Sequence, residues 1–268
     1  MGGLGNQLFQ YALGRAIEIS CHEDVSFETS FFGSQNKRRY MLDVFNTKVK
    51  IRSDSFLRIF KREKHLIEHN LEYIPSLFSD IQEGGRFYLD GYWQTEKYFK
   101  HIRKELLSEI TLKNPYSQDA EILSRAIAAS ATSVAIHVRH GDYITDPQAN
   151  TVLGVCSPEY YHRAIETIQQ KVHDPHFFIF SDDIEWAKDN LNLDPTMTTY
   201  VSGIGLKDEE ELMLMSECKH DIIANSSFSW WSAWLNPNTQ KIIIAPRAWF
   251  KSPDFKTENI IPSSWIRL

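Results

Sequence analysis

The sequence predicts an α/β fold in which helices cover both faces of a parallel sheet. Between residues 119 and 245, segments of helical spacing alternate with short apolar runs, a pattern typical of consecutive βαβ units. One of these runs, residues 134–138, is too short for a helix and too apolar for an exposed strand, which indicates a central strand. Polar clusters follow three of the predicted strands, and in a parallel sheet those strand ends meet at one edge.

The composition allows a large hydrophobic core and excludes some classes of partner. The chain has 268 residues and 42% hydrophobic content, enough for one large or two medium domains. It carries 29 basic and 35 acidic residues, a net charge of −6. This balance argues against binding to nucleic acid or to an anionic membrane.

The cysteines and the hydropathy pattern predict a soluble, cytoplasmic protein. The three cysteines are far apart and form no CxxC pair, so we expect free thiols and neither disulfides nor zinc: Cys21, Cys156 and Cys218. No apolar run approaches the roughly 18–20 residues of a membrane span, and the basic-then-apolar order of a signal peptide is missing. Peripheral contact with the inner face of the membrane is left open.

The chain starts with a glycine-rich loop that leads into a predicted helix. Apolar residues recur with helical spacing, at positions 8, 9, 12, 13, 16 and 17. Asn6 is predicted as the N-cap of this helix. Gly2, Gly3 and Gly5 leave backbone amides accessible next to a helix N-terminus, which suits an anion such as a phosphate. The alternative is a flexible terminus before an amphipathic helix.

Residues 22–75 carry weaker signals. A short strand is predicted near residues 25–27, and a helix-rich stretch follows. His65 and His69 are four residues apart, which on a helix would place both on one face. With no third ligand nearby, a solvated helix face is favoured over a metal site.

An aromatic loop and a linker precede the regular part of the chain. Residues 87–94 predict a strand that runs into a loop, followed by a helix over 96–110. Tyr92 and Trp93 suit stacking on a sugar or packing in a core. The Asn-Pro pair within 113–117 disfavours helix and predicts a linker between domains 1–116 and 117–268.

The second predicted domain alternates helices with strands. We expect helices over 119–130, 158–172, 184–191, 208–219 and 228–235. The strands between them are expected at 134–138, 177–180, 198–201, 221–224 and 241–245.

Three of these strands are followed by polar residues that suit a nucleotide. The polar residues after each strand could instead be ordinary helix caps. Because all three sets are expected at one edge of the sheet, a ligand site is favoured. An arginine and helix N-terminal amides match phosphates, and a carboxylate accepts hydrogen bonds from guanine. No Asp-x-Asp triplet occurs, so a diphosphate would be neutralised without a metal held in that way. The groups are His137, Arg139, His140 and Asp142; Asp182 and Asp183; and Ser226, Ser227 and Ser229.

Five segments in the same order resemble the bacterial α-1,2-fucosyltransferases. They are GGLGNQLFQYA at 2–12, GYWQTEKYF at 91–99, HVRHGDY at 137–143, FFIFSDD at 177–183 and ANSSFSWWSAWLN at 224–236. The resemblance implies a GT-B fold, with two Rossmann-like domains whose parallel sheets face a central cleft. It implies transfer of L-fucose from GDP-β-L-fucose with inversion, without a metal or another cofactor. The implied acceptor is the 2-hydroxyl of galactose on an oligosaccharide or a lipid-linked glycan.

The resemblance also implies roles for individual residues. Arg139 would contact the donor diphosphate and Asn6 would lie beside the leaving group. His137 and either Asp182 or Asp183 would face the guanine. By the same similarity, the serines of 226–229 would contact the phosphates. From the residue types themselves we expect further donor contacts from His140, Gly3 and Gly5, and acceptor contacts from Tyr92 and Trp93.

The chain departs from the family pattern in two places. His140 stands where the family's HxRRxDY has a second arginine, and the charge of a histidine depends on pH near neutrality. The family usually has a short hydrophobic strand before its glycine loop, and the printed sequence starts at that loop.

The catalytic base is open to two interpretations. Asp142, three residues after Arg139, is close enough in sequence to accept a proton from the acceptor hydroxyl. Alternatively, it orients Arg139. Two other classes compete with the transferase: a non-catalytic sugar-nucleotide-binding relative, and a dinucleotide oxidoreductase. The latter is disfavoured because Gly3 and Gly5 are followed by Leu8, so G-x-G-x-x-G is not met.

Overall fold

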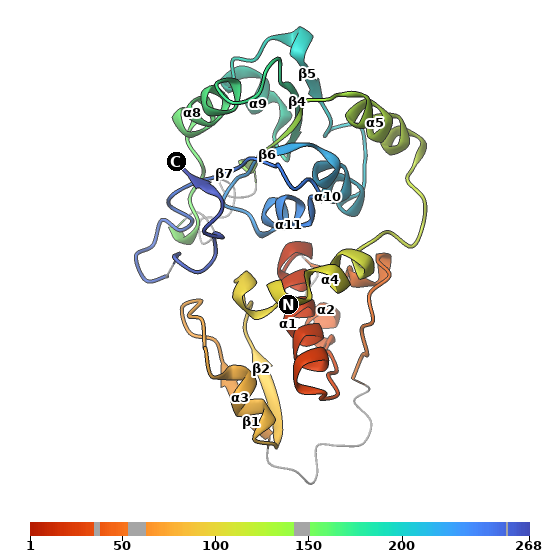
Figure 1. The fold of residues 1–268 in the computed structure, drawn as a ribbon, viewed down its shortest axis with the longest axis vertical. Coiled ribbons are helices and arrows are strands. Elements are labelled where there is room, and N and C mark those ends of the chain that lie inside the picture. The colour runs from red at the N-terminus through yellow and green to blue at the C-terminus, as the bar shows by residue number, and fades with distance from the viewer. Residues whose placement is uncertain (35–37, 53–62, 142–150, 256) are drawn as a thin grey trace. The chain divides into compact units, whose positions relative to one another are not determined.

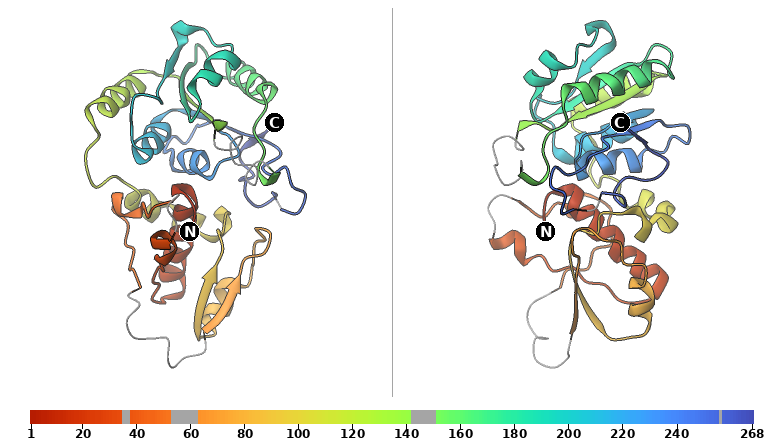
Figure 2. Two further views of the ribbon diagram at one scale, coloured as in Figure 1. Left: turned by 180° about the vertical axis from the view of Figure 1, so that it is seen from behind. Right: turned by 90° about the vertical axis from the view of Figure 1, so that its left-hand side faces the viewer.

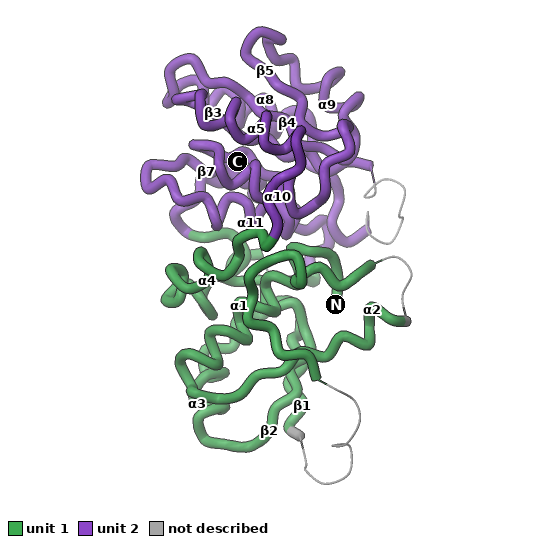
Figure 3. The backbone as a smooth tube through the Cα atoms, turned by 90° about the vertical axis from the view of Figure 1, so that its right-hand side faces the viewer, with its two compact units in different colours: residues 1–113, 254–262 green, residues 114–253, 263–268 purple. Residues whose placement is uncertain are grey.

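The computed structural model describes residues 1–34, 38–52, 63–141, 151–255 and 257–268. These residues group into two compact units (Figure 3). The first contains residues 1–113 and 254–262, and the second contains residues 114–253 and 263–268. Both contain helices and parallel strands, which confirms the predicted α/β class.

The second unit contains a six-stranded sheet in the order β5-β4-β3-β6-β7-β8. All five strand pairs within it are parallel. The strands are β3 (Ser133–Val138), β4 (His176–Ser181), β5 (Thr198–Tyr200), β6 (His220–Ile222), β7 (Ile243–Ala245) and β8 (Ile266–Arg267). As predicted, β3 lies inside the sheet, and every one of its residues is buried.

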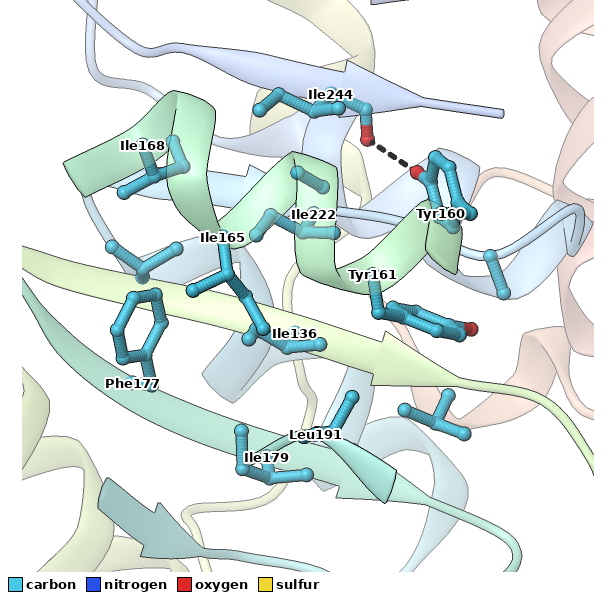
Figure 4. Packing of buried hydrophobic residues seen from close by; sticks show 14 of the residues in the cluster. Ile136, Tyr160, Tyr161, Ile165, Ile168, Phe177, Ile179, Leu191, Ile222 and Ile244 are labelled. Carbon is cyan, nitrogen blue, oxygen red and sulfur yellow. Dashed lines mark hydrogen bonds between the residues drawn. The ribbon is translucent and has the colours of Figure 1, made fainter. Parts of the chain in front are cut away.

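Alternate residues of β3 face different hydrophobic clusters, so both faces of the sheet are covered. Val134, Ile136 and Val138 pack with α8 (Pro158–Gln169) and α9 (Ile184–Asn190), as Figure 4 shows in part. In that cluster the Tyr160 hydroxyl donates to the Ile244 carbonyl at 3.2 Å. Ala135 packs with α5 (Gln118–Ala129) and α10 (Asp208–Glu217). The ribbon views show α8 and α9 grouped together on one side of the sheet (Figures 1 and 2).

The helices of the second unit follow the predicted alternation. The last of them, α11 (Ser227–Leu235), is the next element after β6 and packs against α10. The final strand, β8, was not predicted, because two residues at the end of a chain carry no usable periodicity.

The first unit is built around α1 (Leu4–Cys21), whose predicted apolar face is buried. Its N-cap is Gly3, whose backbone is extended, so the prediction of Asn6 as the N-cap is wrong. The helix begins two residues before Asn6, which therefore lies in its first turn. A glycine at the cap has no side chain with which to bind the first amides of the helix.

A two-stranded parallel sheet accompanies α1. It pairs β1 (Glu63–Ile67) with β2 (Arg86–Asp90), and the segment between them contains α3 (Leu77–Gln82). His65 lies in β1, so the prediction that His65 and His69 share a helix face is wrong. Near residues 25–27, the described part of the chain forms an isolated parallel bridge, between Phe27 and Ile51, and no longer strand.

The predicted helix over 96–110 is interrupted. It consists of two 3₁₀ turns, η2 (Glu96–Tyr98) and η3 (Lys100–Ile102), followed by α4 (Arg103–Glu109). Phe99 separates the two turns, with φ of −139° and a fully buried ring. The remaining short helices of this unit are α2 (Ser30–Ser34) and the 3₁₀ turn η1 (Leu42–Val44), and the second unit has the 3₁₀ turn η4 (Pro195–Met197).

Residues 254–262 group with the first unit, although the sequence assigned them to the second domain. Ile260 and Ile261 are 1% and 2% exposed. Lys97 donates to the side-chain oxygen of Asn259 at 2.5 Å. All three cysteines are free thiols, as predicted. Among the described residues, no helix is both long and apolar enough to cross a membrane.

Candidate functional site

The carboxyl edge of the six-stranded sheet holds most of the predicted donor residues. Because the strands are parallel, β3, β4 and β6 end at the same edge. Arg139 and His140 follow β3 directly, Asp182 and Asp183 follow β4, and Ser226 follows β6 after three intervening residues. We call this edge the donor rim.

Arg139 and Asp182 lie together at the donor rim. Arg139 Nε lies 3.4 Å from Asp182 Oδ2, and both side chains are about one-fifth to one-quarter exposed, at 24% and 21%. The other carboxylate oxygen of Asp182 accepts from the backbone amide of His140 at 2.8 Å. Asp182 thus ties the end of β4 to the segment after β3, and it holds a negative charge beside the guanidinium.

His140 and Asp183 form a second pair. His140 Nδ1 lies 2.8 Å from Asp183 Oδ2, and the imidazole stacks on the Trp186 indole with ring centroids 4.5 Å apart. Asp183 is also the N-cap of α9, since its other oxygen accepts from the Trp186 amide at 3.1 Å. The contact with His140 is the main reason that the pKa of Asp183 is lowered. Both oxygens of Asp183 are therefore engaged, one in capping α9 and the other in holding His140.

His137 is buried at the end of β3, with 4% exposure. Burial lowers the pKa of His137 to about 3, and the nearby Arg139 charge lowers it further. The imidazole is therefore neutral under physiological conditions. Its Nδ1 has no hydrogen-bond partner among the described residues, and its ring lies 5.7 Å from that of Phe228.

The three predicted serines differ in role. Ser226 is the N-cap of α11 and accepts from the Phe228 amide at 3.3 Å. Ser227 is partly exposed in the first turn. Ser229 is fully buried, and its hydroxyl donates to the backbone carbonyls of Ala224 and Ser226. Ser229 thus stabilises the start of α11 and does not reach the surface of the donor rim.

Two residues that sequence reasoning missed also shape the donor rim. Asn225 Nδ2 lies within 3.2 Å of three backbone carbonyls, those of Leu153, Gly154 and Trp249, so it joins three loops. Glu211 on α10 interacts with the Ser202 hydroxyl and, more weakly, with the charge of Asp182; burial raises its pKa to about 7.

The sequence offers different signals for these two residues. Asn225 directly follows the predicted strand 221–224, a position where an amide often organises a turn. Glu211 is one of four consecutive acidic residues, Asp208–Glu211, a pattern that by itself predicts only a solvated helix start.

In the first unit, Asn6 contacts the aromatic loop. Its Oδ1 accepts from Gln94 Nε2 at 2.7 Å. Gly2 has a φ of +82°, and a Cβ there would lie 2.6 Å from Asn6 Nδ2, so this position requires glycine. Gly3 caps α1, while Gly5 is buried within it.

The two predicted acceptor residues are placed differently. Tyr92 is half-buried. Trp93 is 2% exposed, and its indole packs edge-on against Tyr98 at 5.9 Å, so it serves as a core residue in this structure. Stacking on a sugar therefore stays a prediction, and the half-buried Tyr92 suits that role better than the buried Trp93. Asp142 lies outside the described residues. Within them, no cluster of three His, Cys, Asp or Glu side chains could hold a metal ion.

Comparisons with known proteins identify a single family. The sequence profile of glycosyl transferase family 11 matches residues 2–268. An α-1,2-colitosyltransferase of Escherichia coli is 33% identical over all of this chain and 96% of its own length. The O-antigen biosynthesis glycosyltransferase WbnK of E. coli is 28% identical over all of this chain and 98% of its own.

More distant similarity extends to animals. The galactoside α-(1,2)-fucosyltransferase 2 of Rattus norvegicus is 25% identical, over 88% of this chain and 65% of that protein. Among solved structures, POFUT1 in complex with GDP-fucose is 14% identical and covers 91% of this chain and 95% of that chain, with a TM-score of 0.47.

Proposed function

Since its profile match spans nearly the whole sequence, the chain belongs to glycosyl transferase family 11, and from this premise we propose that it transfers L-fucose from GDP-β-L-fucose. The proposed acceptor is the 2-hydroxyl of a terminal β-galactoside, on an oligosaccharide or a lipid-linked glycan, and the anomeric carbon is inverted. The α-1,2 linkage in the names of relatives, including the E. coli colitosyltransferase and the rat fucosyltransferase, supports this choice.

The position of Arg139 carries the proposal for the donor. This guanidinium lies at the carboxyl end of a buried central strand, beside Asp182 and at the same edge as the N-terminus of α11. In the proposed complex Arg139 donates to the leaving diphosphate and the first amides of α11 add donors. Asp182 and the neutral His137 then recognise the guanine.

We propose that Arg139 and the first amides of α11 compensate the charge of the diphosphate, so that transfer is independent of a metal. As the bond to the sugar breaks, negative charge develops on the diphosphate, and a fixed guanidinium stabilises it without reorganisation of solvent. His140, held in place by Asp183 and the Trp186 indole, is proposed to add a further donor contact beside Arg139.

For proton removal from the acceptor hydroxyl, Asp142 is the proposed base, with orientation of Arg139 as its alternative role. Asn6 is proposed to act beside the leaving group. Replacement of Asp142 by Asn would separate the two roles of this aspartate, because a lost base lowers kcat alone whereas a lost orienting contact also weakens GDP binding.

Colitose is the second candidate donor sugar, favoured by the 33% identity to the E. coli α-1,2-colitosyltransferase. Colitose is L-fucose without its 3-hydroxyl group, so both sugars fit one reaction scheme. Competition between GDP-fucose and GDP-colitose at equal concentration, with lactose as acceptor, identifies the preferred donor from the ratio of kcat/KM values.

The proposed function is tested by replacing Arg139 with Ala. Removing a charge-assisted contact to the diphosphate should lower kcat/KM by at least about a hundredfold, as measured by release of GDP from GDP-fucose with lactose. Because the proposed transfer needs no metal, the activity of the wild type should also survive the addition of EDTA. The matched control is Arg125→Ala, which removes an exposed arginine of the same unit that pairs with Glu121. Normal turnover by Arg139→Ala would contradict the donor assignment, and GDP binding without any turnover by the wild type would favour a non-catalytic relative.

A further inference from the structure

Glu68 follows β1 directly and holds the loop that follows β2. Its Oε2 accepts hydrogen bonds from two successive backbone amides, those of Tyr92 at 2.7 Å and Trp93 at 2.8 Å. Burial raises the pKa of Glu68, and the two amide contacts oppose that rise. The segment Gly91–Gln94 is therefore fixed by the acidic side chain that follows the neighbouring strand β1, and we call this segment the clamped loop.

Gly91 is required for this contact. A Cβ at position 91 would lie 2.5 Å from the Cβ of Glu68 and 2.8 Å from its Oε2, distances that atoms cannot adopt without a shift. The Gly91 carbonyl is itself bound by Gln10 Nε2 from α1 at 3.1 Å. The close approach of Glu68 thus depends on the absence of a side chain at residue 91.

The clamped loop holds a backbone conformation that needs support. Trp93 has a φ of +59°, in the left-handed region that a bulky residue rarely adopts. Such conformations persist where the surroundings fix them, and here Glu68 binds the amide of Trp93 while its indole is buried. The next residue, Gln94, donates to Asn6 Oδ1 at 2.7 Å. A chain of contacts thus runs from Glu68 through the loop to the first turn of α1.

We propose that Glu68 is a positioning residue for the acceptor side of the transfer reaction. The clamped loop and Glu68 both follow parallel strands at their carboxyl ends, where α/β folds bind ligands. The loop presents Tyr92, and its end orients Asn6. This inference rests on the proposed function, in which the first unit binds the acceptor.

The test compares two variants that open the clamped loop by different means. Glu68→Ala removes the carboxylate, whereas Gly91→Ala pushes it away. Loss of contacts to a charged group should raise the KM for lactose by about tenfold or more in both variants. The affinity for GDP, measured by calorimetry, should change less than about twofold, since the donor contacts proposed for Arg139, Asp182 and the start of α11 lie in the second unit. Glu68→Gln, which keeps one acceptor oxygen, should lie between Glu68→Ala and the wild type.

The control is Glu109→Gln. Glu109 is a buried carboxylate of the same unit that accepts from Arg15 Nε at 2.9 Å and from Arg15 Nη2 at 2.8 Å. Its replacement should lower the unfolding temperature and leave the KM for lactose unchanged. If Glu68→Ala and Gly91→Ala also lower only the unfolding temperature, or reduce GDP affinity in parallel, the positioning role is refuted.

Failure of the proposed function is recognised separately. In that case the wild type itself transfers no sugar from GDP-fucose or GDP-colitose. Hydrogen exchange at the Tyr92 and Trp93 amides then tests the clamp without any substrate. Faster exchange at both amides in Glu68→Ala supports it, and unchanged exchange overturns it.

Discussion

Two titratable side chains near the donor rim respond to pH in opposite directions. Burial lowers the pKa of His137 to about 3, so the folded state binds fewer protons there than the unfolded state. The free energy of unfolding therefore decreases as pH falls below about 6.5. Burial raises the pKa of Glu211 to about 7 from an ordinary 4.5, so the folded state holds an extra proton. The contribution of Glu211 to the free energy of unfolding is therefore fully present below about pH 4.5 and is lost as pH rises toward 7.

We therefore expect Glu211→Gln to become more stable relative to the wild type as pH rises. Glutamine keeps a polar contact with Ser202 but cannot ionise beside Asp182 and Asp208. The difference in free energy of unfolding between variant and wild type should grow by on the order of 1–3 kcal/mol from pH 4.5 to pH 8. Urea unfolding at both values measures it, and a pH-independent difference would show that Glu211 titrates normally.

At the residue scale, the sequence predicted which residues lie at the donor rim better than it predicted what each of them contacts. Arg139 and Asp182 could be placed at one edge because they end neighbouring parallel strands. The capping role of Asp183 and Ser226 is also a local property of short polar side chains and was foreseen as an alternative. Glu211 could not be foreseen, because its burial depends on how α10 packs on the sheet.

The N-terminal turn of α11 is the element that most directly tests the donor rim. Ser226→Ala removes the side-chain cap on the Phe228 amide and should cost about 1 kcal/mol of stability. Because this turn is the proposed phosphate site, GDP affinity should fall as well. Asp194→Ala is the matched control: Asp194 caps η4 before β5, at the opposite edge of the sheet, by accepting from the Thr196 amide. The control should lose stability only, as measured by urea unfolding and calorimetry with GDP, and equal affinities in both variants would contradict the assignment.

At the element scale, the second unit was predictable because its strands are apolar and its helices have regular spacing. The first unit was harder. The strand β1 reads Glu-Lys-His-Leu-Ile, which lacks the apolar alternation of a strand and suggests a polar helix. The segment 96–110 has helical composition, but its helical course is broken at Phe99, whose burial overrides local preference.

For the whole molecule, the break after residue 113 was marked in the sequence by an Asn-Pro pair. The grouping of residues 254–262 with the first unit was not marked. Local composition does not reveal which core a late segment joins, since that depends on contacts between residues far apart in the chain. The proposed acceptor and donor roles of the two units stay predictions.

Residues 254–262 should matter for the stability of the folded chain although they lie far in sequence from the rest of their unit. Ile260→Ala removes a nearly fully buried side chain and should cost about 2–5 kcal/mol. Urea unfolding measures the loss, and GDP affinity of the folded variant should stay unchanged. A loss below about 0.5 kcal/mol would indicate that the segment is dispensable.

Because residues 254–262 belong to the first unit, they also limit how family members can be recombined. A chimera that joins residues 1–113 of this chain to the remainder of a relative would combine one parent's first unit with the other parent's version of 254–262. Lys97 and Asn259, which hydrogen bond to each other, would then come from different parents. A chimera that keeps the first unit of one parent intact therefore requires that residues 1–113 and 254–262 are transplanted together.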